Sequence, residues 1–173
     1  MNSDFPGIIF IGPPGSGKSS IGRALAKKIE QKFADTDALI EESQGKSVSQ
    51  IFIEEGEIFF RQVEEAICLA RISENISVLS LGGGAILSLL VREQLLSSNN
   101  LIIFLDVTLA VAAPRVGFNR DRPLLLHSPR QQWQQLMDIR RPIYEELASL
   151  VIEVGDRPIS EIVDEILSKG GSL

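Results

Sequence analysis

The sequence has few residues of the types that form disulfides and histidine metal sites. Cys68 is the only cysteine and His127 the only histidine among 173 residues, which excludes an internal disulfide and a multi-histidine metal site. A single cysteine suits a reducing compartment. Cys68 also lies among apolar residues at helical spacing, which indicates a buried and unreactive thiol.

Long apolar runs and a surplus of positive charge are missing as well. No apolar run approaches membrane-spanning length, and the first residues lack the basic and apolar segments of a secretory signal. The formal net charge is -6, whereas general nucleic-acid binding needs a basic face. We therefore expect a cytoplasmic protein that binds neither membranes nor nucleic acid. Any anion must be captured by a local cluster of donors.

What the sequence does contain is an alternation of short apolar runs and longer segments with helical periodicity. The expected strands are residues 7–11, 32–34, 77–81, 101–105 and 150–154. Continuous apolar runs are typical of parallel strands covered by helices on both faces, so the pattern predicts an α/β fold. Residues 47–74 predict consecutive helices interrupted at Gly56, the first with a capping box of Ser47 and Gln50. Residues 115–130 predict an exposed, mobile loop.

Residues 12–19 match the pattern G-x-x-x-x-G-K-[ST], between the first expected strand and a helical pattern. Glycines let consecutive backbone N–H groups point at one anion, and the following helix adds its partial positive charge. Lys18 would reach the β- and γ-phosphates, and the Ser19 hydroxyl can bind Mg²⁺. The pattern predicts a P-loop rather than a plain turn; a dinucleotide loop fails because its third glycine falls on Ser20. The predicted phosphate contacts are Gly15, Ser16, Gly17, Lys18, Ser19 and Ser20.

Two acidic or basic segments are candidates for the acceptor site. Asp35 and Asp37 either cap the next helix, or divide the work between Mg²⁺ and a substrate hydroxyl. In residues 56–65, Arg61 either pairs with Glu65 on a solvated face or is a planar fork for a substrate carboxylate, oriented by Glu64. The buried face of this helix is expected to consist of Phe59, Val63, Ala66 and Ile67.

Two strand ends carry further signals. Residues 80–85, SLGGGA, end an apolar strand with three glycines, at the edge where α/β sheets bind ligands, so we expect ligand contact there. Asp106 ends the apolar run at residues 101–105. It is either a magnesium-binding aspartate or, as we favour, a structural residue, with Asp106 or Thr108 capping the next helix. The sequence N-K-x-D that reads guanine is absent, which argues against a GTP switch.

Together these segments resemble shikimate kinase, the P-loop enzyme that phosphorylates the 3-hydroxyl of shikimate with ATP. The resemblance covers GPPGSGKSSIGRALA, FADTDALIEE, GKSVSQIFIEEGEIFFRQVEE, SLGGGAI, NRDRPLL and IRRPIYEELA, in that family's order over most of residues 7–150. It implies a three-layer P-loop fold of the nucleoside-monophosphate-kinase type, with a five-stranded parallel sheet flanked by helices. The implied organisation is one kinase domain, residues 1–173, with substrate-binding helices, a substrate-binding region at about 36–62 and a mobile lid at about 115–127.

The resemblance also implies a role for each site residue and a place in aromatic amino-acid biosynthesis. Lys18, Asp37 and Arg122 would be catalytic, with Asp37 accepting the hydroxyl proton and Arg122 closing on the phosphoryl group. Ser19 and Asp35 would hold Mg²⁺. Shikimate would contact Asp37, Arg61, Gly82, Gly83, Gly84 and Arg140, with Glu64 orienting Arg61. The remaining contacts to ATP would be Arg115 over adenine, Arg122 and Arg157.

Several alternatives stay open on the sequence alone. Pro114 can shorten the helix before Arg115, Arg120 is a second candidate for the lid arginine, and Arg140 is preferred to Arg141 by alignment to Pro142. The alternative enzyme is another small-molecule P-loop kinase, such as gluconate kinase. A non-catalytic ligand-binding relative is the alternative of a different class. We expect a monomer.

Overall fold

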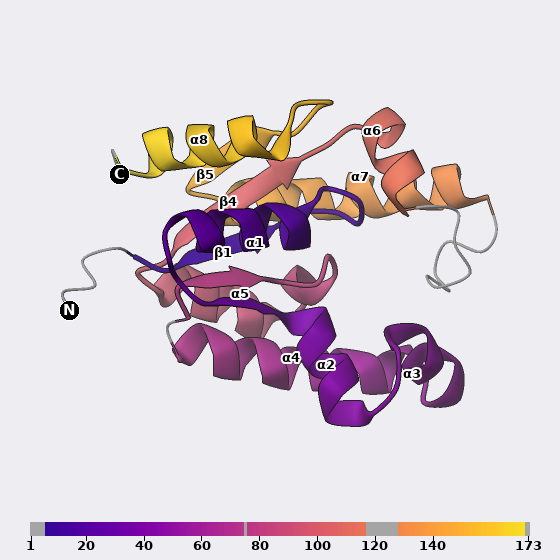
Figure 1. Cartoon of the computed structure of the whole chain (residues 1–173). Helices are drawn as coiled ribbons and strands as arrows, with labels where there is room; N and C mark the ends of the chain where they lie inside the picture. Colours follow the sequence, from indigo (N-terminus) through magenta and orange to yellow (C-terminus); the bar gives the residue numbers. More distant parts are fainter. Residues whose placement is uncertain (1–5, 75, 117–127, 172–173) are drawn as a thin grey trace.

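Five parallel strands form a single sheet at the centre of the computed structural model, which describes residues 6–74, 76–116 and 128–171 (Figure 1). The strand order is β2-β3-β1-β4-β5. The strands are β1 (Ile8–Ile11), β2 (Phe33–Asp35), β3 (Val78–Ser80), β4 (Leu101–Asp106) and β5 (Leu150–Glu153). All five strands predicted from apolar runs are confirmed, with small differences at their ends, and so is the parallel α/β architecture.

The inner strands β3, β1 and β4 are buried on both faces, which explains the continuous apolar runs of β1 and β4. In the register of β1, Ile9 lies opposite Leu79 of β3 and Ile102 of β4, and these residues pack into the larger core. Their neighbours Ile8 and Phe10 point to the other face and pack into a second core. Because successive side chains alternate between faces, a strand covered on both faces is apolar at nearly every position, whereas the edge strand β5 exposes Val151 and Glu153.

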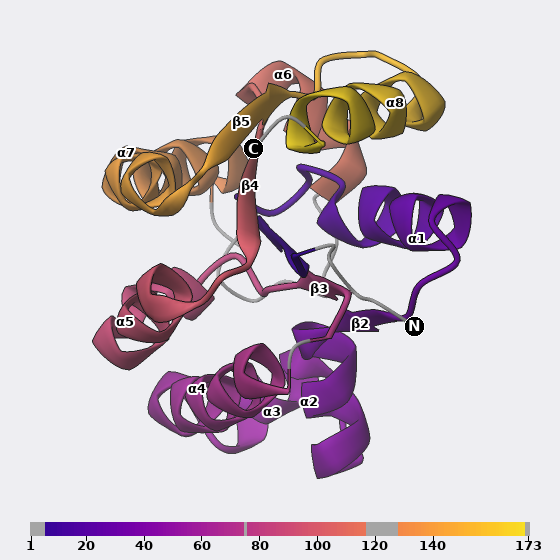
Figure 2. The ribbon, with the colours of Figure 1, turned by 90° about the vertical axis from the view of Figure 1, so that its left-hand side faces the viewer.

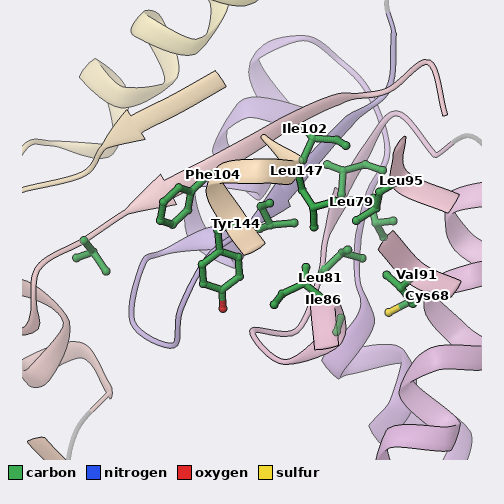
Figure 3. Packing of buried hydrophobic residues seen from close by; sticks show 14 of the residues in the cluster. Cys68, Leu79, Leu81, Ile86, Val91, Leu95, Ile102, Phe104, Tyr144 and Leu147 are labelled. Atoms are coloured by element: carbon green, nitrogen blue, oxygen red, sulfur yellow. The ribbon is translucent and has the colours of Figure 1, made fainter. Parts of the chain in front are cut away.

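Helices cover the two faces separately (Figure 2). The helices α1 (Lys18–Lys28) and α8 (Ile159–Gly170) pack on the face of Ile8. The opposite face is covered by α5 (Leu89–Ser97) and α7 (Pro129–Leu147), and the C-terminal half of α4 (Glu57–Ser73) joins the same core. Figure 3 shows the apolar side chains between these elements. None of the helices in the described ranges is long and apolar enough to cross a membrane.

A separate small core supports the helices between β2 and β3. The helices α2 (Thr36–Gln44) and α3 (Val48–Glu54) pack against the N-terminal half of α4 through Ile40, Ile51 and Phe60. The capping box of Ser47 and Gln50 at the start of α3 is confirmed. Gly56, with φ of +87°, precedes α4, so the predicted interruption is confirmed too.

The predicted buried face of α4 is wrong, because the buried stripe is shifted along the sequence by one position. Phe60, Glu64, Cys68 and Ile72 are its buried residues, whereas Ala66 is exposed and Phe59, Val63 and Ile67 are only partly buried. The reason is that α4 lies between two cores. Its partly buried side chains pack on the small core, while its most buried stripe brings a carboxylate, Glu64, inward.

The remaining elements flank the carboxyl ends of the strands. A short 3-10 helix, η1 (Ala85–Leu87), follows β3, and α6 (Leu109–Val116) follows β4. The helix α6 contains Pro114 and continues to Val116, so it does not end at this proline. The ends of the predicted 115–130 loop belong to α6 and α7. Its interior, with the lid candidates Arg120 and Arg122 and with His127, lies outside the described residues.

Candidate functional site

The loop between β1 and α1 wraps around a point above the carboxyl end of the central strand. Gly15 and Gly17 have φ of +82° and +88°, a region that L-residues rarely adopt. A Cβ on Gly15 would lie 2.7 Å from Val116 Cγ2 and 2.9 Å from the Ala112 carbonyl oxygen, because α6 packs directly on the loop. Gly17 also precedes α1 without a capping side chain, so the first N–H groups of that helix suit an anion.

The Lys18 side chain lies over the same loop. Its Nζ donates hydrogen bonds to the Gly12 carbonyl at 2.8 Å and to the Pro13 carbonyl at 3.1 Å, and it lies 3.5 Å from Ser16 Oγ. Ser16 itself is buried beneath the loop. The ammonium group is therefore placed beside the N-terminus of α1, where both would attract phosphate oxygens.

A cavity of about 430 Å³ opens from this loop. This volume is in the range of small-molecule sites. Most of the predicted ATP contacts line it, together with both aspartates and one glycine of the SLGGGA turn: Gly15, Gly17, Lys18, Ser19, Ser20, Asp35, Asp37, Gly83, Arg115 and Arg157. Residues that are separated by more than a hundred positions in the chain thus meet around one space.

The two arginines of this set lie where α6 and β5 end. Arg115 Nη2 is 3.3 Å from the Gly155 carbonyl, and Arg157 pairs with Glu165 at 2.6 Å. Val154, Ile159 and Ile162 supply apolar lining beside them. A planar aromatic ring would fit between such guanidinium and aliphatic groups.

The geometry of Asp35 is compatible with both predicted roles, a helix cap and a ligand of Mg²⁺. One carboxylate oxygen accepts a hydrogen bond from the Asp37 N–H at 3.0 Å and so caps α2. The other accepts a hydrogen bond from the Ser19 hydroxyl. Within the described ranges, no cluster of three or more His, Cys, Asp or Glu residues could hold a metal. Two neighbouring oxygen ligands nevertheless fit Mg²⁺, which takes its remaining ligands from phosphates and water.

A second cluster adjoins the cavity and is centred on Arg61. Its Nη1 donates to Glu64 at 2.6 Å, and its Nη2 lies 3.5 Å from Glu57. The alternative of an Arg61–Glu65 pair is wrong, because Glu65 accepts a hydrogen bond from Ser88 instead, at 2.5 Å. Arg61 Nε is buried and meets no hydrogen-bond acceptor among the described residues. A buried donor without a partner is costly, which points to an anionic ligand on this edge of the guanidinium.

The three glycines after β3 allow these side chains to approach. A Cβ on Gly82 would lie 2.6 Å from Asp37 Oδ1 and 2.7 Å from Glu64 Oε1. A Cβ on Gly84 would overlap the Arg61 guanidinium, at 2.6 Å from both Cζ and Nη2. The glycines therefore make room for Asp37, Glu64 and Arg61, whatever contact they also make with a ligand.

Burial dominates the electrostatics of this cluster. It raises the pKa of the Glu64 carboxyl, with the Arg61 charge acting against it and the nearby Asp37 charge adding to it. Burial also raises the pKa of the Cys68 thiol, as expected for an unreactive cysteine.

Neighbouring arginines on α7 point to different places. Arg140 is buried, and its charge acts on both Glu64 and Tyr144. Arg141 instead donates to both carboxylate oxygens of Asp106, at 2.6 and 2.9 Å. This arrangement supports the choice of Arg140 for the substrate cluster. It also gives Asp106 a structural partner, although that partner is an arginine rather than a helix terminus.

Three polar contacts to backbone groups of the site were not predicted from the sequence. The Trp133 indole N–H donates to the Pro14 carbonyl at 2.9 Å, and the Tyr144 hydroxyl donates to the Gly83 carbonyl at 2.6 Å. Thr36, which is fully buried, accepts a hydrogen bond from the Gly82 N–H at 2.9 Å. The spacing of Trp133, Arg140 and Tyr144 along α7 was the available signal, because it places them on one face.

Comparison with known proteins agrees with this geometry. The family model described as shikimate kinase matches residues 14–170, which is nearly the whole chain. The chain belongs to the shikimate kinase family. It is therefore an enzyme, a kinase with ATP as its co-substrate.

Alignments with individual shikimate kinases cover almost the full length of both this chain and the relative. The shikimate kinase of Rhodococcus jostii is 40% identical over 165 residues, which are 95% of this chain and 97% of the relative. That of Streptomyces coelicolor is 38% identical over 162 residues, or 94% of each chain.

Solved structures show the same fold. A shikimate kinase from Acinetobacter baumannii in complex with shikimate is 33% identical and superposes with a TM-score of 0.94, over 98% of this chain and 95% of that one. A gluconokinase from Sinorhizobium meliloti is 23% identical with a TM-score of 0.60, over 97% of this chain and 93% of that one. At that identity the likeness shows a shared fold and does not favour the gluconate alternative.

Proposed function

We propose that the chain transfers the γ-phosphoryl group of ATP to the 3-hydroxyl of shikimate, which yields shikimate 3-phosphate and ADP. One observation carries the proposal: the cavity of the P-loop includes Asp37, and Asp37 lies against the same glycine turn as Glu64 and Arg61. The predicted phosphate site and the predicted carboxylate-binding site would therefore share one wall. The shikimate complex of the Acinetobacter baumannii relative supports shikimate as the acceptor.

The nucleotide half of the site would act by neutralising charge. Lys18 would exchange the Gly12 and Pro13 carbonyls for phosphate oxygens, while the N–H groups of the loop and of α1 hold the rest of the phosphate chain. Arg115 and Arg157, which line the cavity, would contact adenine. Arg122, or Arg120 beside it, would close on the transferring group and exclude water.

The residues Ser19 and Asp35 would hold Mg²⁺, since their oxygens adjoin each other beside the P-loop. Bound there, the ion supplies charge that compensates the phosphate oxygens. Asp35 keeps its second oxygen on the N-terminus of α2 and so orients the pair.

The acceptor half would grip a carboxylate and one hydroxyl. Glu64 occupies Nη1 of Arg61, so the edge formed by Nε and Nη2 is the one that a substrate carboxylate would take, in place of the exposed Glu57. Arg140 would add a second positive charge from α7, beside the backbone of the three glycines. Asp37 would then accept the proton of the 3-hydroxyl while the oxygen attacks phosphorus. A monomeric state and a cytoplasmic location stay predictions from the sequence.

The test compares two arginines on α4. Arg61→Ala should weaken shikimate binding by about 2–5 kcal/mol, which is roughly 30-fold or more, and leave the affinity for Mg-ADP nearly unchanged. Arg71→Ala is the matched control, because Arg71 forms an exposed pair with Glu74 at the same spacing and at 2.6 Å. Both affinities can be measured by calorimetry. An equal loss of shikimate and ADP binding in Arg61→Ala alone would contradict the proposed role.

A further inference from the structure

One face of α7 reaches both halves of the site. Trp133, Met137, Arg140 and Tyr144 are all buried and follow each other at helical spacing. The first and last of them donate hydrogen bonds to backbone carbonyls rather than to side chains. One carbonyl belongs to the P-loop and the other to the turn of three glycines. The proposed function uses both loops.

Trp133 holds the P-loop. Its indole N–H donates to the Pro14 carbonyl at 2.9 Å, and the residue is 4% exposed in the larger core. Pro14 directly precedes Gly15, which has φ of +82° and lines the cavity. The larger core holds the indole in place, and the indole in turn holds the Pro14 carbonyl, which belongs to the residue before Gly15.

Tyr144 holds the glycine turn. Its ring stacks on Phe104 with centroids 5.1 Å apart, while its hydroxyl points out of the apolar cluster (Figure 3) and meets the Gly83 carbonyl at 2.6 Å. Gly83 lies between the two glycines that make room for Asp37, Glu64 and Arg61. A shift of this carbonyl would therefore move the wall against which the acceptor residues lie.

The P-loop and the glycine turn lie next to each other, yet each receives its own hydrogen bond from α7. A Cβ on Gly83 would lie 3.2 Å from Pro14 Cδ. We propose that Trp133 and Tyr144 are positioning residues with separate tasks: Trp133 sets the P-loop for the nucleotide, and Tyr144 sets the glycine turn for shikimate. The assignment rests on the proposed function, and it adds two residues that contact neither substrate.

The test is a crossed pair of variants that each remove one donor; Tyr144→Phe keeps the ring, whereas Trp133→Phe also replaces the indole with a smaller phenyl ring. Trp133→Phe should raise the Kd of Mg-ADP by about 3- to 10-fold and change that of shikimate less than about twofold, as expected for loss of one hydrogen bond. Tyr144→Phe should do the reverse. Met137→Leu is the control, because Met137 lies on the same face, buried, and the exchange nearly conserves its volume. Calorimetry with each ligand alone measures the affinities, and thermal unfolding checks the fold.

A purely structural role predicts a different pattern. If both variants weakened both ligands alike, or if neither changed any affinity, the proposal would be overturned. A second measurement uses the unsubstituted protein, in which Trp133 is the only tryptophan. Mg-ADP should shift its fluorescence, while shikimate alone should leave the emission nearly unchanged; an equal response to both would contradict the assignment. Failure of the unsubstituted chain to bind shikimate would refute the proposed function, whereas the effect of Trp133→Phe on ADP would still be measured.

Discussion

The exchange Gly84→Ala tests whether the absence of a side chain at Gly84 is needed to make room for the Arg61 guanidinium. Gly84 has φ of -98° and ψ of -3°, which alanine adopts without strain, so the backbone tolerates the change. The new Cβ would lie 2.6 Å from Arg61 Cζ and Nη2, which forces the guanidinium to move. Because that group is the end of a flexible side chain, we expect the protein to fold and to lose the Arg61–Glu64 alignment instead.

The size of the effect follows from the bond that is lost. A hydrogen bond between charged groups contributes about 1.5–3 kcal/mol, so the Kd of shikimate should rise roughly 10- to 100-fold. The Kd of Mg-ADP should stay the same, since Gly84 does not line the nucleotide cavity. Titration calorimetry with each ligand is the assay. Normal shikimate affinity in folded Gly84→Ala would refute the reasoning that shikimate binding depends on the position that Gly84 allows Arg61 to take.

The control for this experiment is Gly45→Ala, which should show the opposite pattern. Gly45 ends α2 with φ of +63°, and no atom lies within 4 Å of a Cβ placed on it. The left-handed conformation should cost alanine about 1 kcal/mol of unfolding free energy, without an effect on either ligand. Loss of stability and loss of shikimate binding are thereby separated in two single-methyl changes.

Two further predictions concern proton transfer and pH. Asp37→Asn should lower kcat by about 10²-fold or more while the fold and ADP affinity persist, and near-normal turnover would exclude Asp37 as the base. Burial raises the pKa of Tyr144 to about 12 from 10.0, so its contribution to stability is complete below pH 10.0 and lost as the pH rises toward 12. Because Tyr144 is the only tyrosine, the ultraviolet absorbance of tyrosinate assigns the titration directly. A midpoint near 10.0 in folded protein would contradict the buried hydroxyl.

Local patterns were sufficient for most of the fold. The five strands, the capping box at Ser47 and the break at Gly56 each depend on a short stretch of chain, and each is confirmed. The P-loop is equally local, since glycine spacing and a following helix define it. The face of α4 failed because a carboxylate, Glu64, is among its most buried residues, and hydrophobicity alone assigns carboxylates to the surface.

Contacts between distant segments were beyond the reach of spacing arguments. Trp133 and Pro14 are 119 residues apart, and Tyr144 and Gly83 are 61 apart, so only the packed fold brings them together. The same limit applies to Arg141, which pairs with Asp106 on β4 as well as with Glu145 on its own helix. The glycine turn was predicted to approach a ligand; the structure adds that side chains of the protein itself need the room.

The most direct test of the account is ADP release from Mg-ATP in the presence of different acceptors. The panel consists of shikimate, gluconate, nucleoside monophosphates and no acceptor. The account predicts turnover with shikimate and only background release with the others, because the Arg61 cluster adjoins the phosphate cavity and needs a carboxylate beside a hydroxyl at the right spacing. Turnover with gluconate or a nucleotide but not with shikimate, from folded protein that binds ATP, would contradict the acceptor site while leaving the P-loop assignment intact.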